Sequence, residues 1–388
     1  MKFVFKGVVC VKWLAVLTAA VMTAVTGVVR VKAADISEIS AKSAIVYNGE
    51  TGDILFEKNA YEQLPMASTT KIMSVLLVLE SGGLDERFVV DSEAIKVEGS
   101  SMGLQEGDKV TLRDLCYGML LPSGNDAANA AAVKVAGSTQ KFVELMNDKA
   151  QVLGLVDTHF VTPSGLDDDT DEHYSTAYDM ARLTAEAMKN ADFRAICSQK
   201  SAKVCFGDPP YERWLMNSNK LLKSCEGIVG VKTGFTDKAR RCLVSACDRN
   251  GAELICVTLN APDDWNDHSK LYDYCFEFIS MQALPLDKKK YYLNIVGGDS
   301  DKVLCETETA EAVLLNGYAQ KVETMVYLPA FAYAPVKNGE QVGKVVYSYN
   351  GRVIAEKPII VKENYSRAEV DKPSIIEYYI DRIKSIFS

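Results

Sequence analysis

Histidine is scarce in this sequence. Only three of the 388 residues are histidines, and His159, His173 and His268 do not have the spacing of metal ligands. The cysteines predict no zinc site either, because no Cys-x-x-Cys pair occurs. Basic residues are too few for a nucleic-acid-binding surface, since the net charge is -9 and phosphate binding requires a positive stripe. We therefore interpret the histidines as structural or surface residues and expect no metal ion, no organic cofactor and no nucleic-acid partner.

The N-terminal segment has a composition of its own. Three lysines precede an apolar run from Trp13 to Val29, and Ala33-Ala34 follow shortly after. This order is typical of a secretory signal, so we assign residues 1–33 to a cleaved signal peptide. An uncleaved membrane anchor is the alternative, because the run has the shortest length that spans a bilayer, about 17 to 25 residues. Both interpretations predict export to the outer face of the cytoplasmic membrane and the cell-wall space.

Disulfide bonds are not expected. Removal of Cys10 with the signal leaves nine cysteines, and an odd number without a regular spacing does not indicate a disulfide framework. Cys242 and Cys247 lie five residues apart in a strand-like run, so they face opposite sides of the strand and cannot pair. We predict that most of the nine are buried free thiols.

The length suits two domains of roughly 150 residues each. Two apolar segments, 44–47 and 54–56, flank a polar turn and predict a β-hairpin. Helical patterns follow at 68–79, 112–121, 126–135 and 175–189; strand patterns occupy 228–233, 242–247 and 254–259, before a helix at 267–278. This order predicts an α+β domain in residues 34–282, with an antiparallel sheet whose strands are connected through a helical block.

The C-terminal part has another pattern. Short strands and turns dominate, and Asn350-Gly351 between alternating runs indicates a hairpin, so we expect a small all-β, sandwich-like domain at 283–363. Residues 364–388 are assigned to a linker and an amphipathic helix that associates with a membrane surface. Packing of this helix on its own domain is the alternative. Its apolar face would carry Ile375, Ile376, Tyr379, Ile380, Ile383, Ile386 and Phe387.

Three short motifs carry the chemistry. Amide hydrolysis by a serine requires a nucleophile, a base, donors for the oxyanion and an acid for the leaving amine. Ser68 and Lys71 provide the first two, because residues three apart on a helix share a face. Lysine is a base only when uncharged, and burial or a nearby cation such as Lys232 lowers its pKa. Ser123-Gly124-Asn125, on a turn between helices, can relay a proton and hold the substrate backbone.

Each motif alone is a weak signal, and two of the three occur a second time in the sequence, so the order of the motifs is the specific evidence. Ser138-Thr139-Gln140-Lys141 also has the Ser-x-x-Lys spacing, but we interpret Ser138 as the N-cap of a helix. Ser348-Tyr349-Asn350 also fits Ser-x-Asn, but it lies on a hairpin beyond Lys232. The specific signal is the order Ser-x-x-Lys, Ser-x-Asn and Lys-Thr-Gly, each in a suitable helix, turn or strand.

In this order the motifs resemble those of the low-molecular-mass penicillin-binding proteins that act as serine D-alanyl-D-alanine carboxypeptidases. The resemblance covers nearly the whole chain and implies the penicillin-binding and β-lactamase-like serine transpeptidase fold. It implies removal of the terminal D-alanine from peptidoglycan stem pentapeptides through an acyl-enzyme, and covalent inhibition by β-lactams. The residues that carry it are Ser68-Thr69-Thr70-Lys71, Ser123-Gly124-Asn125 with Asp126-Ala127-Ala128, and Gly230-Val231-Lys232-Thr233-Gly234-Phe235-Thr236-Asp237.

The resemblance also implies roles for these residues. Ser68 would be the acylated nucleophile and Lys71 its base, and the backbone N–H groups of Ser68 and Phe235 would form the oxyanion hole. The segment 99–104 resembles the loop that borders the family's site, although a plain surface turn is the alternative. The remaining assignments are Ser123 as proton relay, Asn125 as substrate clamp, and Lys232, Thr233 and Gly234, with Phe235, as the substrate-binding strand.

Two positions depart from the family pattern. Ser164 precedes Gly165-Leu166 where the family usually has a histidine, and Arg240-Arg241 occur where a glycine is expected. Both changes leave the shape and charge of the pocket edge open.

Two other functions share part of this signature. A β-lactamase would need a glutamate with an asparagine four residues later to activate water, and Glu186 and Asn190 have that spacing. They continue a helical pattern, so we interpret them as helix-surface residues. A non-catalytic penicillin- or peptidoglycan-binding scaffold is disfavoured because every expected catalytic residue is present. Transfer of the acyl group to an amine in place of water remains open.

Overall fold

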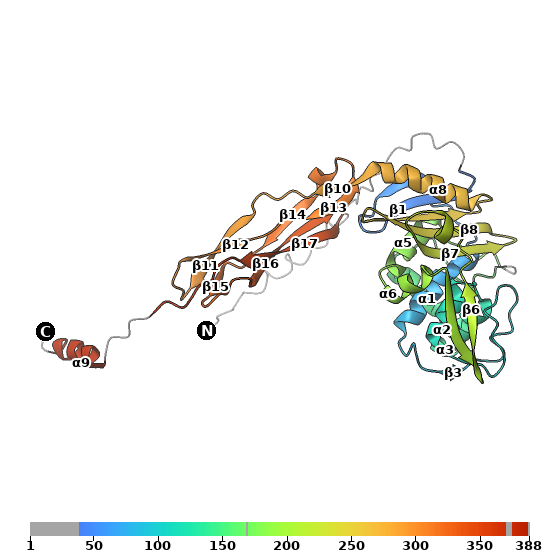
Figure 1. Ribbon diagram of the computed structural model, residues 1–388, viewed down its shortest axis with the longest axis horizontal. Helices are drawn as coiled ribbons and strands as arrows, with labels where there is room; N and C mark the ends of the chain where they lie inside the picture. Colours follow the sequence, from blue (N-terminus) through green and yellow to red (C-terminus); the bar gives the residue numbers. More distant parts are fainter. Residues whose placement is uncertain (1–38, 168–169, 370–374, 387–388) are drawn as a thin grey trace, which may run out of the picture.

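The computed structural model describes residues 39–167, 170–369 and 375–386. The expected signal segment, residues 1–33, lies outside the described residues. Two bodies follow one another along the chain, a rounded N-terminal one and an elongated β-rich one, and a C-terminal helix lies beyond the second (Figure 1).

A five-stranded antiparallel sheet forms the centre of the first body. Its strand order is β2-β1-β9-β8-β7, so the first hairpin and the three later strands join in one sheet. This confirms the predicted hairpin and strands. The strands are β1 (Ser43–Asn48), β2 (Ile54–Lys58), β7 (Ile228–Thr236), β8 (Arg240–Arg249) and β9 (Ala252–Leu259).

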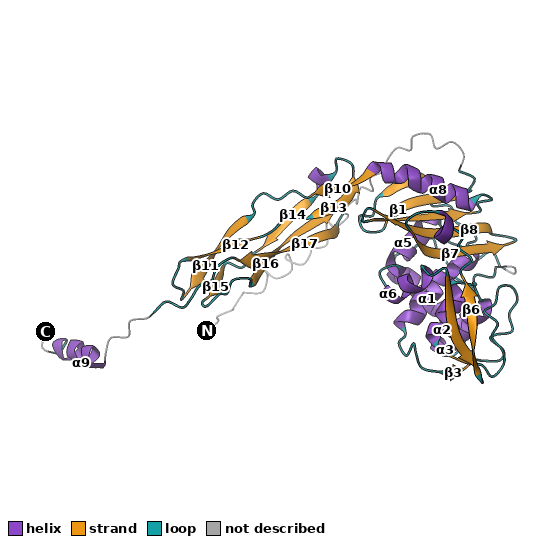
Figure 2. Cartoon of the chain, in the orientation of Figure 1, coloured by secondary structure: helices purple, strands orange, loops and turns teal. Residues whose placement is uncertain are grey.

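Helices cover both faces of this sheet. Helix α8 (Asp264–Cys275) packs on one face, and the helical block between β2 and β7 packs on the other, where α5 contacts β1 and β9 and α6 contacts β7 (Figure 2). The block also contains two small two-stranded antiparallel sheets, β3-β4 and β5-β6, that the sequence patterns did not predict. Its elements are the 3-10 helix η1 (Ala67–Thr70), α1 (Lys71–Glu80), β3 (Phe88–Val89), β4 (Lys109–Val110), α2 (Leu112–Leu120), α3 (Asn125–Ala136), α4 (Thr139–Val152), α5 (Ala177–Ala187), α6 (Ala191–Cys197), β5 (Ser201–Gly207), β6 (Pro210–Met216) and α7 (Leu221–Ser224).

Helix α1 is the most deeply buried element of the block. Ile72, Met73, Val75 and Val78 have no exposed surface, and burial of each such side chain contributes roughly 1.5–3 kcal/mol. Residues that come directly before this helix are therefore held in fixed positions.

The second body has its own apolar core. A short 3-10 helix η2 (Phe276–Phe278) and β10 (Ile279–Ala283) lead into it, and β10 pairs with β13 (Glu311–Leu315). A six-stranded sheet follows, in the order β14-β16-β17-β12-β11-β15. Its elements are β11 (Lys290–Val296), β12 (Lys302–Glu306), η3 (Ala319–Lys321), β14 (Glu323–Tyr327), β15 (Phe331–Tyr333), β16 (Gln341–Tyr349) and β17 (Arg352–Val361).

The turn between β16 and β17 docks on the turn between β1 and β2. Asn350 and Gly351 both have positive φ, as the predicted hairpin requires. The Asn350 side chain donates to Asp53 Oδ1 at 3.0 Å, and Arg352 donates to Gly49 O at 2.9 Å and to the Tyr47 hydroxyl at 2.7 Å. These contacts lie at the edge of the central sheet opposite β7.

The chain ends in helix α9 (Ile375–Lys384). Ile376, Tyr379, Ile380 and Ile383 are exposed on it, whereas Phe387 of the expected apolar face lies outside the described residues. Within residues 39–167, 170–369 and 375–386, no helix combines the length and the apolar character that crossing a bilayer requires. The association of α9 with a membrane surface stays a prediction.

From the hydrogen bonds of the β16–β17 turn we expect that this hairpin limits the motion of the second body relative to the first. We expect the double substitution Asn350→Ala and Arg352→Ala to broaden the distribution of interatomic distances in small-angle X-ray scattering, because each lost hydrogen bond contributes about 0.5–1.5 kcal/mol. Labelling by fluorescent penicillin should stay within about twofold, since the contacts lie on the sheet edge away from β7. Lys344→Ala, which removes an ion pair with Glu356 inside the same hairpin, is the control. Scattering identical to that of the wild type would contradict this prediction.

Candidate active site

Ser68 lies on the short helix η1, directly before α1. Ala67 has φ +48° and Gly165 has φ +89°. A β-carbon on Gly165 would collide with the Ala67 carbonyl, so the residue that follows Ser164 has to be a glycine for the two segments to meet. The backbone around 165 thus supports the turn that presents Ser68.

The Lys71 amine is surrounded by three oxygen atoms. Its Nζ lies 2.8 Å from Ser68 Oγ, 2.7 Å from Asn125 Oδ1 and 2.7 Å from Ser164 O, and the side chain is fully buried. The last two oxygens can only accept hydrogen bonds. An uncharged amine can donate its two N–H groups to them and direct its lone pair toward the Ser68 hydroxyl.

The electrostatics of the site favour this uncharged form. Burial, and then the positive charge of Lys232, lower the pKa of Lys71 well below its ordinary value, against a smaller opposing effect of Asp126. Burial also lowers the pKa of Lys232, to about 7. The Lys232 ammonium donates to Thr233 O at 2.7 Å.

Ser123 and Asn125 come from the turn before α3. Ser123 has φ +69° and lines the same cavity as Ser68. The Asn125 side chain is bound at both ends, because Oδ1 accepts from Lys71 and Nδ2 donates to Glu98 O at 2.7 Å. Its rotamer is therefore fixed by the site itself.

Asp126 holds the loop that borders the cavity. Its carboxylate accepts hydrogen bonds from Ser101 Oγ and from the backbone N–H groups of Met102, Gly103 and Leu104, at 2.6 to 3.1 Å. Ser100 O accepts from Asn125 N at 2.7 Å, and Ser100 lines the cavity. The segment 99–104 is thus fixed beside Ser68 and is not a plain surface turn.

Strand β7 forms the other side of the cavity that Ser68 lines. A β-carbon on Gly234 would lie 3.1 Å from both Met66 O and Ser68 N, so the glycine allows the strand to approach the serine turn. Thr233 Oγ1 is 2.8 Å from Ser218 Oγ. Phe235 is exposed at the rim.

These segments enclose a cavity of about 340 Å³. Lys71, Asn125 and Lys232 are buried behind its wall, so all predicted site residues meet in one place. Several lining residues were not predicted. The cavity is lined by Ser68, Ser100, Pro122, Ser123, Ser218, Lys220, Thr233, Gly234, Phe235, Arg241, Asp264 and Trp265.

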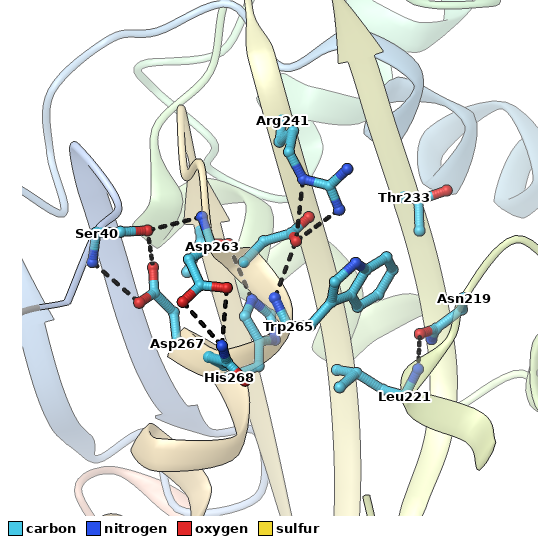
Figure 3. A network of polar contacts seen from close by, with 12 residues as sticks. Ser40, Asn219, Leu221, Thr233, Arg241, Asp263, Trp265, Asp267 and His268 are labelled. Atoms are coloured by element: carbon cyan, nitrogen blue, oxygen red, sulfur yellow. Dashed lines mark hydrogen bonds and ion pairs between the residues drawn. The ribbon is translucent and has the colours of Figure 1, made fainter. Parts of the chain in front are cut away.

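Arg241 supplies a positive charge at the edge of this cavity. Its Nε and Nη2 donate to Asp264 Oδ1 at 3.1 and 2.7 Å, and its guanidinium carbon lies 5.4 Å from the centre of the Trp265 ring. Figure 3 shows Arg241 and Trp265 beside the strand that carries Thr233. The departure at 240–241 therefore places one arginine in the pocket, whereas Arg240 is exposed with φ +59°.

A histidine does support the site, although not at position 164. His173 is buried, its Nδ1 accepts from Val161 N at 2.9 Å, and its Nε2 is 2.8 Å from Thr70 Oγ1. Nε2 must then carry the proton and donate to Thr70, whose hydroxyl donates to Ala67 O at 2.8 Å. Burial, followed by the charges of His159 and Lys71, lowers the pKa of His173 to about 3, so the ring stays neutral.

The other expectations from the sequence can now be compared with the fold. Ser138 caps α4 by accepting from Lys141 N at 3.1 Å, as predicted. His268 is a buried structural residue that contacts Ser245 and Thr258.

The pair of residues expected of a β-lactamase lies elsewhere. Glu186 lies on α5 and lines a different cavity from Ser68. The prediction that Asn190 continues this helix is wrong: α5 ends at Ala187, and Asn190 instead caps α6 by accepting from Asp192 N and Phe193 N.

Two family models match the chain. The D-alanyl-D-alanine carboxypeptidase family matches residues 29–263, and the C-terminal domain of penicillin-binding protein 5 matches residues 281–367. The chain belongs to the D-alanyl-D-alanine carboxypeptidase family. It is accordingly a serine-type hydrolase of D-alanyl-D-alanine peptides.

Relatives resemble this carboxypeptidase over most of its length. D-alanyl-D-alanine carboxypeptidase DacF of Bacillus subtilis is 32% identical over 84% of this chain and 86% of its own. DacC of Escherichia coli is 32% identical over 84% of each chain. Penicillin-binding protein 5 of Haemophilus influenzae superposes with a TM-score of 0.61 at 26% identity, over 86% of this chain and all of its own. The DD-transpeptidase of Streptomyces K15 superposes with a TM-score of 0.59 at 34% identity, over 62% of this chain and 98% of its own.

The position of His173 predicts a rate effect without a change in substrate contacts. We expect His173→Ala to lower kcat for D-alanine release by about 10- to 100-fold with little change in KM, because loss of the Thr70 contact lets the serine turn shift. His173→Gln, which can restore a donor to Thr70, should recover part of the loss. His159→Ala, on the same loop but without contact to Thr70, is the control. Equal kcat values for all four proteins would refute a positioning role.

Proposed function

We propose that Ser68 is the nucleophile that this carboxypeptidase acylates and that Lys71 is its general base. The observation that carries this proposal is the buried Lys71 amine, 2.8 Å from the Ser68 hydroxyl with two carbonyl oxygens as its other neighbours. An amine whose pKa is held well below its ordinary value accepts the serine proton more readily than the amine of an exposed lysine.

Acylation then proceeds in one cleft. Ser68 Oγ attacks the carbonyl carbon of the D-alanyl-D-alanine bond while its proton moves to Lys71. The backbone N–H groups of Ser68 and Phe235 stabilise the negative oxygen. The Ser123 hydroxyl passes a proton to the leaving nitrogen, so that D-alanine departs as a neutral amine and the ester on Ser68 remains.

Asn125 and the β7 strand orient the substrate. The amide of Asn125, already fixed by Lys71 and Glu98, holds the peptide backbone. Thr233, at the rim of the cavity beside Ser218, binds the terminal carboxylate of the substrate, with Lys232 supplying positive charge from behind. We add Arg241 to this group, since its guanidinium forms the cationic edge of the cavity and carboxylates favour planar guanidinium partners.

The partners follow from the same chemistry. The acceptor of the acyl group is water, which Lys71 deprotonates, and the substrate is the peptidoglycan stem peptide that ends in D-alanyl-D-alanine. β-Lactams acylate the same serine.

The proposed domain boundaries complete this assignment. Within residues 34–282 we place the peptidase domain and within 283–363 the β-domain, while 364–388 holds the chain at the outer face of the cytoplasmic membrane.

An assay of D-alanine release tests the assignment. The full chain is incubated with a diacyl-L-Lys-D-Ala-D-Ala peptide, and free D-alanine is measured. We expect release by the wild type and none by Ser68→Ala, and Lys71→Ala should also lose labelling by penicillin because the base is gone. Labelling at the wild-type rate by Lys71→Ala near neutral pH would remove Lys71 from the role of base.

The same assay separates the rival functions. Penicillin labelling without D-alanine release would indicate a scaffold, and rapid consumption of the β-lactam would indicate a lactamase. Ser138→Ala, which changes the second Ser-x-x-Lys sequence at a helix cap, is the matched control and should retain activity.

The charge of Lys232 predicts a shift of the pH profile. Because this charge lowers the pKa of Lys71, Lys232→Met should raise that pKa, and the rising limb of the acylation rate should move to higher pH. Lys232→Arg keeps the charge and should move the limb less. The measurement is the rate of penicillin acylation across pH. A rising limb at the same pH in the methionine variant and the wild type would contradict the repulsion between the Lys232 and Lys71 charges.

A further inference from the structure

Two cysteines contact the same backbone carbonyl oxygen away from the active site. All nine cysteines of the described residues are free, and seven are buried, as predicted for most of them. Cys225, before β7, and Cys247, at the end of β8, both contact one carbonyl oxygen. Glu226 O lies 3.9 Å from Cys225 Sγ and 3.4 Å from Cys247 Sγ. The two thiols therefore belong to one cluster.

The backbone at this cluster is already tightly joined. Asp248 N donates to Gly227 O at 2.8 Å, and a β-carbon on Gly227 would lie 3.1 Å from Cys247 Sγ. The segment that carries Cys225 thus passes directly over the buried sulfur of Cys247. A covalent link between the two sulfurs would connect the turn before β7 to β8, two segments that are already hydrogen-bonded to each other.

An arginine completes the cluster. Arg249 Nη2 lies 3.4 Å from Cys225 Sγ, Arg249 Nε donates to Glu226 O at 3.2 Å, and Nη1 donates to Asp273 at 2.8 Å. The guanidinium is held in place by the carbonyl and the carboxylate and faces the sulfur. The arginine can therefore donate a hydrogen bond to this sulfur.

Small molecules can reach Cys225 but not Cys247. Cys225 is half-buried, and it lines a surface cavity of about 650 Å³ together with Gly227, Arg249 and Asp273. Cys247 is completely buried, and burial raises its pKa to about 12. The solvent-accessible thiol, Cys225, is therefore the one that contacts the arginine, whereas Cys247 is shielded from solvent.

We propose that Cys225 is a modification site for low-molecular-mass disulfides and that Cys247 resolves the mixed disulfide. The Cys225 thiolate attacks one sulfur of the disulfide, which forms a Cys225 mixed disulfide and releases one thiolate. The Cys247 sulfur then attacks Cys225, forms the Cys225–Cys247 disulfide and releases the second thiolate, which takes the Cys247 proton. Two protein thiols are oxidised and one small disulfide is reduced to two thiols.

The chain contains a matched control thiol. Cys205 on β5 is exposed, but no arginine side chain or second cysteine contacts its sulfur among the contacts of the described residues. If exposure alone decided reactivity, Cys205 would react faster than Cys225. The proposal requires the reverse order.

The test uses oxidised glutathione and the full chain. Modified peptides are followed by mass spectrometry in the wild type and in Cys225→Ser, Cys247→Ser and Arg249→Gln, and penicillin labelling checks that each variant is folded. We expect the wild type to lose the two thiols together, with glutathione on Cys225 only as a transient and a Cys225–Cys247 linked peptide as the product. In Cys247→Ser the glutathione adduct on Cys225 should accumulate.

The two remaining variants test the roles of Arg249 and Cys225. Arg249→Gln should slow modification of Cys225 about fivefold or more while leaving Cys205 unchanged. In Cys225→Ser, Cys247 should remain unmodified. The proposal is overturned if Cys205 reacts as fast as Cys225 in the wild type, or if the wild-type adduct persists while Cys247 stays a free thiol.

Discussion

The site depends on one constraint, a lysine amine that has to be uncharged inside the protein. Removal of an ammonium group from water costs several kcal/mol even after the surroundings relax, so a buried lysine favours its neutral form. At Lys71 two carbonyl oxygens occupy the N–H groups of that neutral form, and the repulsion of Lys232 adds to the effect of burial. The fold therefore favours the uncharged form of the Lys71 amine beside Ser68 by excluding water, and no histidine contacts this amine among the hydrogen bonds of the described residues.

This constraint explains why the site combines segments far apart in the sequence. Burial of Lys71 needs cover on every side, and α1, the turn before α3, the backbone at 164 and β7 each provide one side. Asp126 then fixes the bordering loop, and His173 fixes the serine turn through Thr70. A neutral imidazole suits this second role, because a charged ring beside Lys71 would add repulsion without adding a base.

The sequence predicted the parts of the site that depend on local spacing. Ser68 and Lys71 are three residues apart at a helix start, and Lys-Thr-Gly lies on a strand, so their local geometry follows from backbone periodicity. The fold class and the central strands followed from the same patterns. His173, Ser218 and Trp265 could not be predicted, because only tertiary packing brings them to the site. Asp126 follows Asn125 in one of the three motifs, but no sequence pattern predicts its four hydrogen bonds to the bordering loop.

The two departures from the family pattern have different consequences. At Ser164 the backbone carbonyl contacts Lys71, so the loss of an imidazole at that side chain does not remove the contact. At Arg241 a large cation enters the cavity and binds Asp264, the one carboxylate among the residues that line this cavity. In the part of the chain that the structure describes, the cavity therefore offers no free carboxylate to activate water. On the proposed mechanism Lys71 therefore activates the acceptor as well as the serine, because Asp264 is already paired with Arg241.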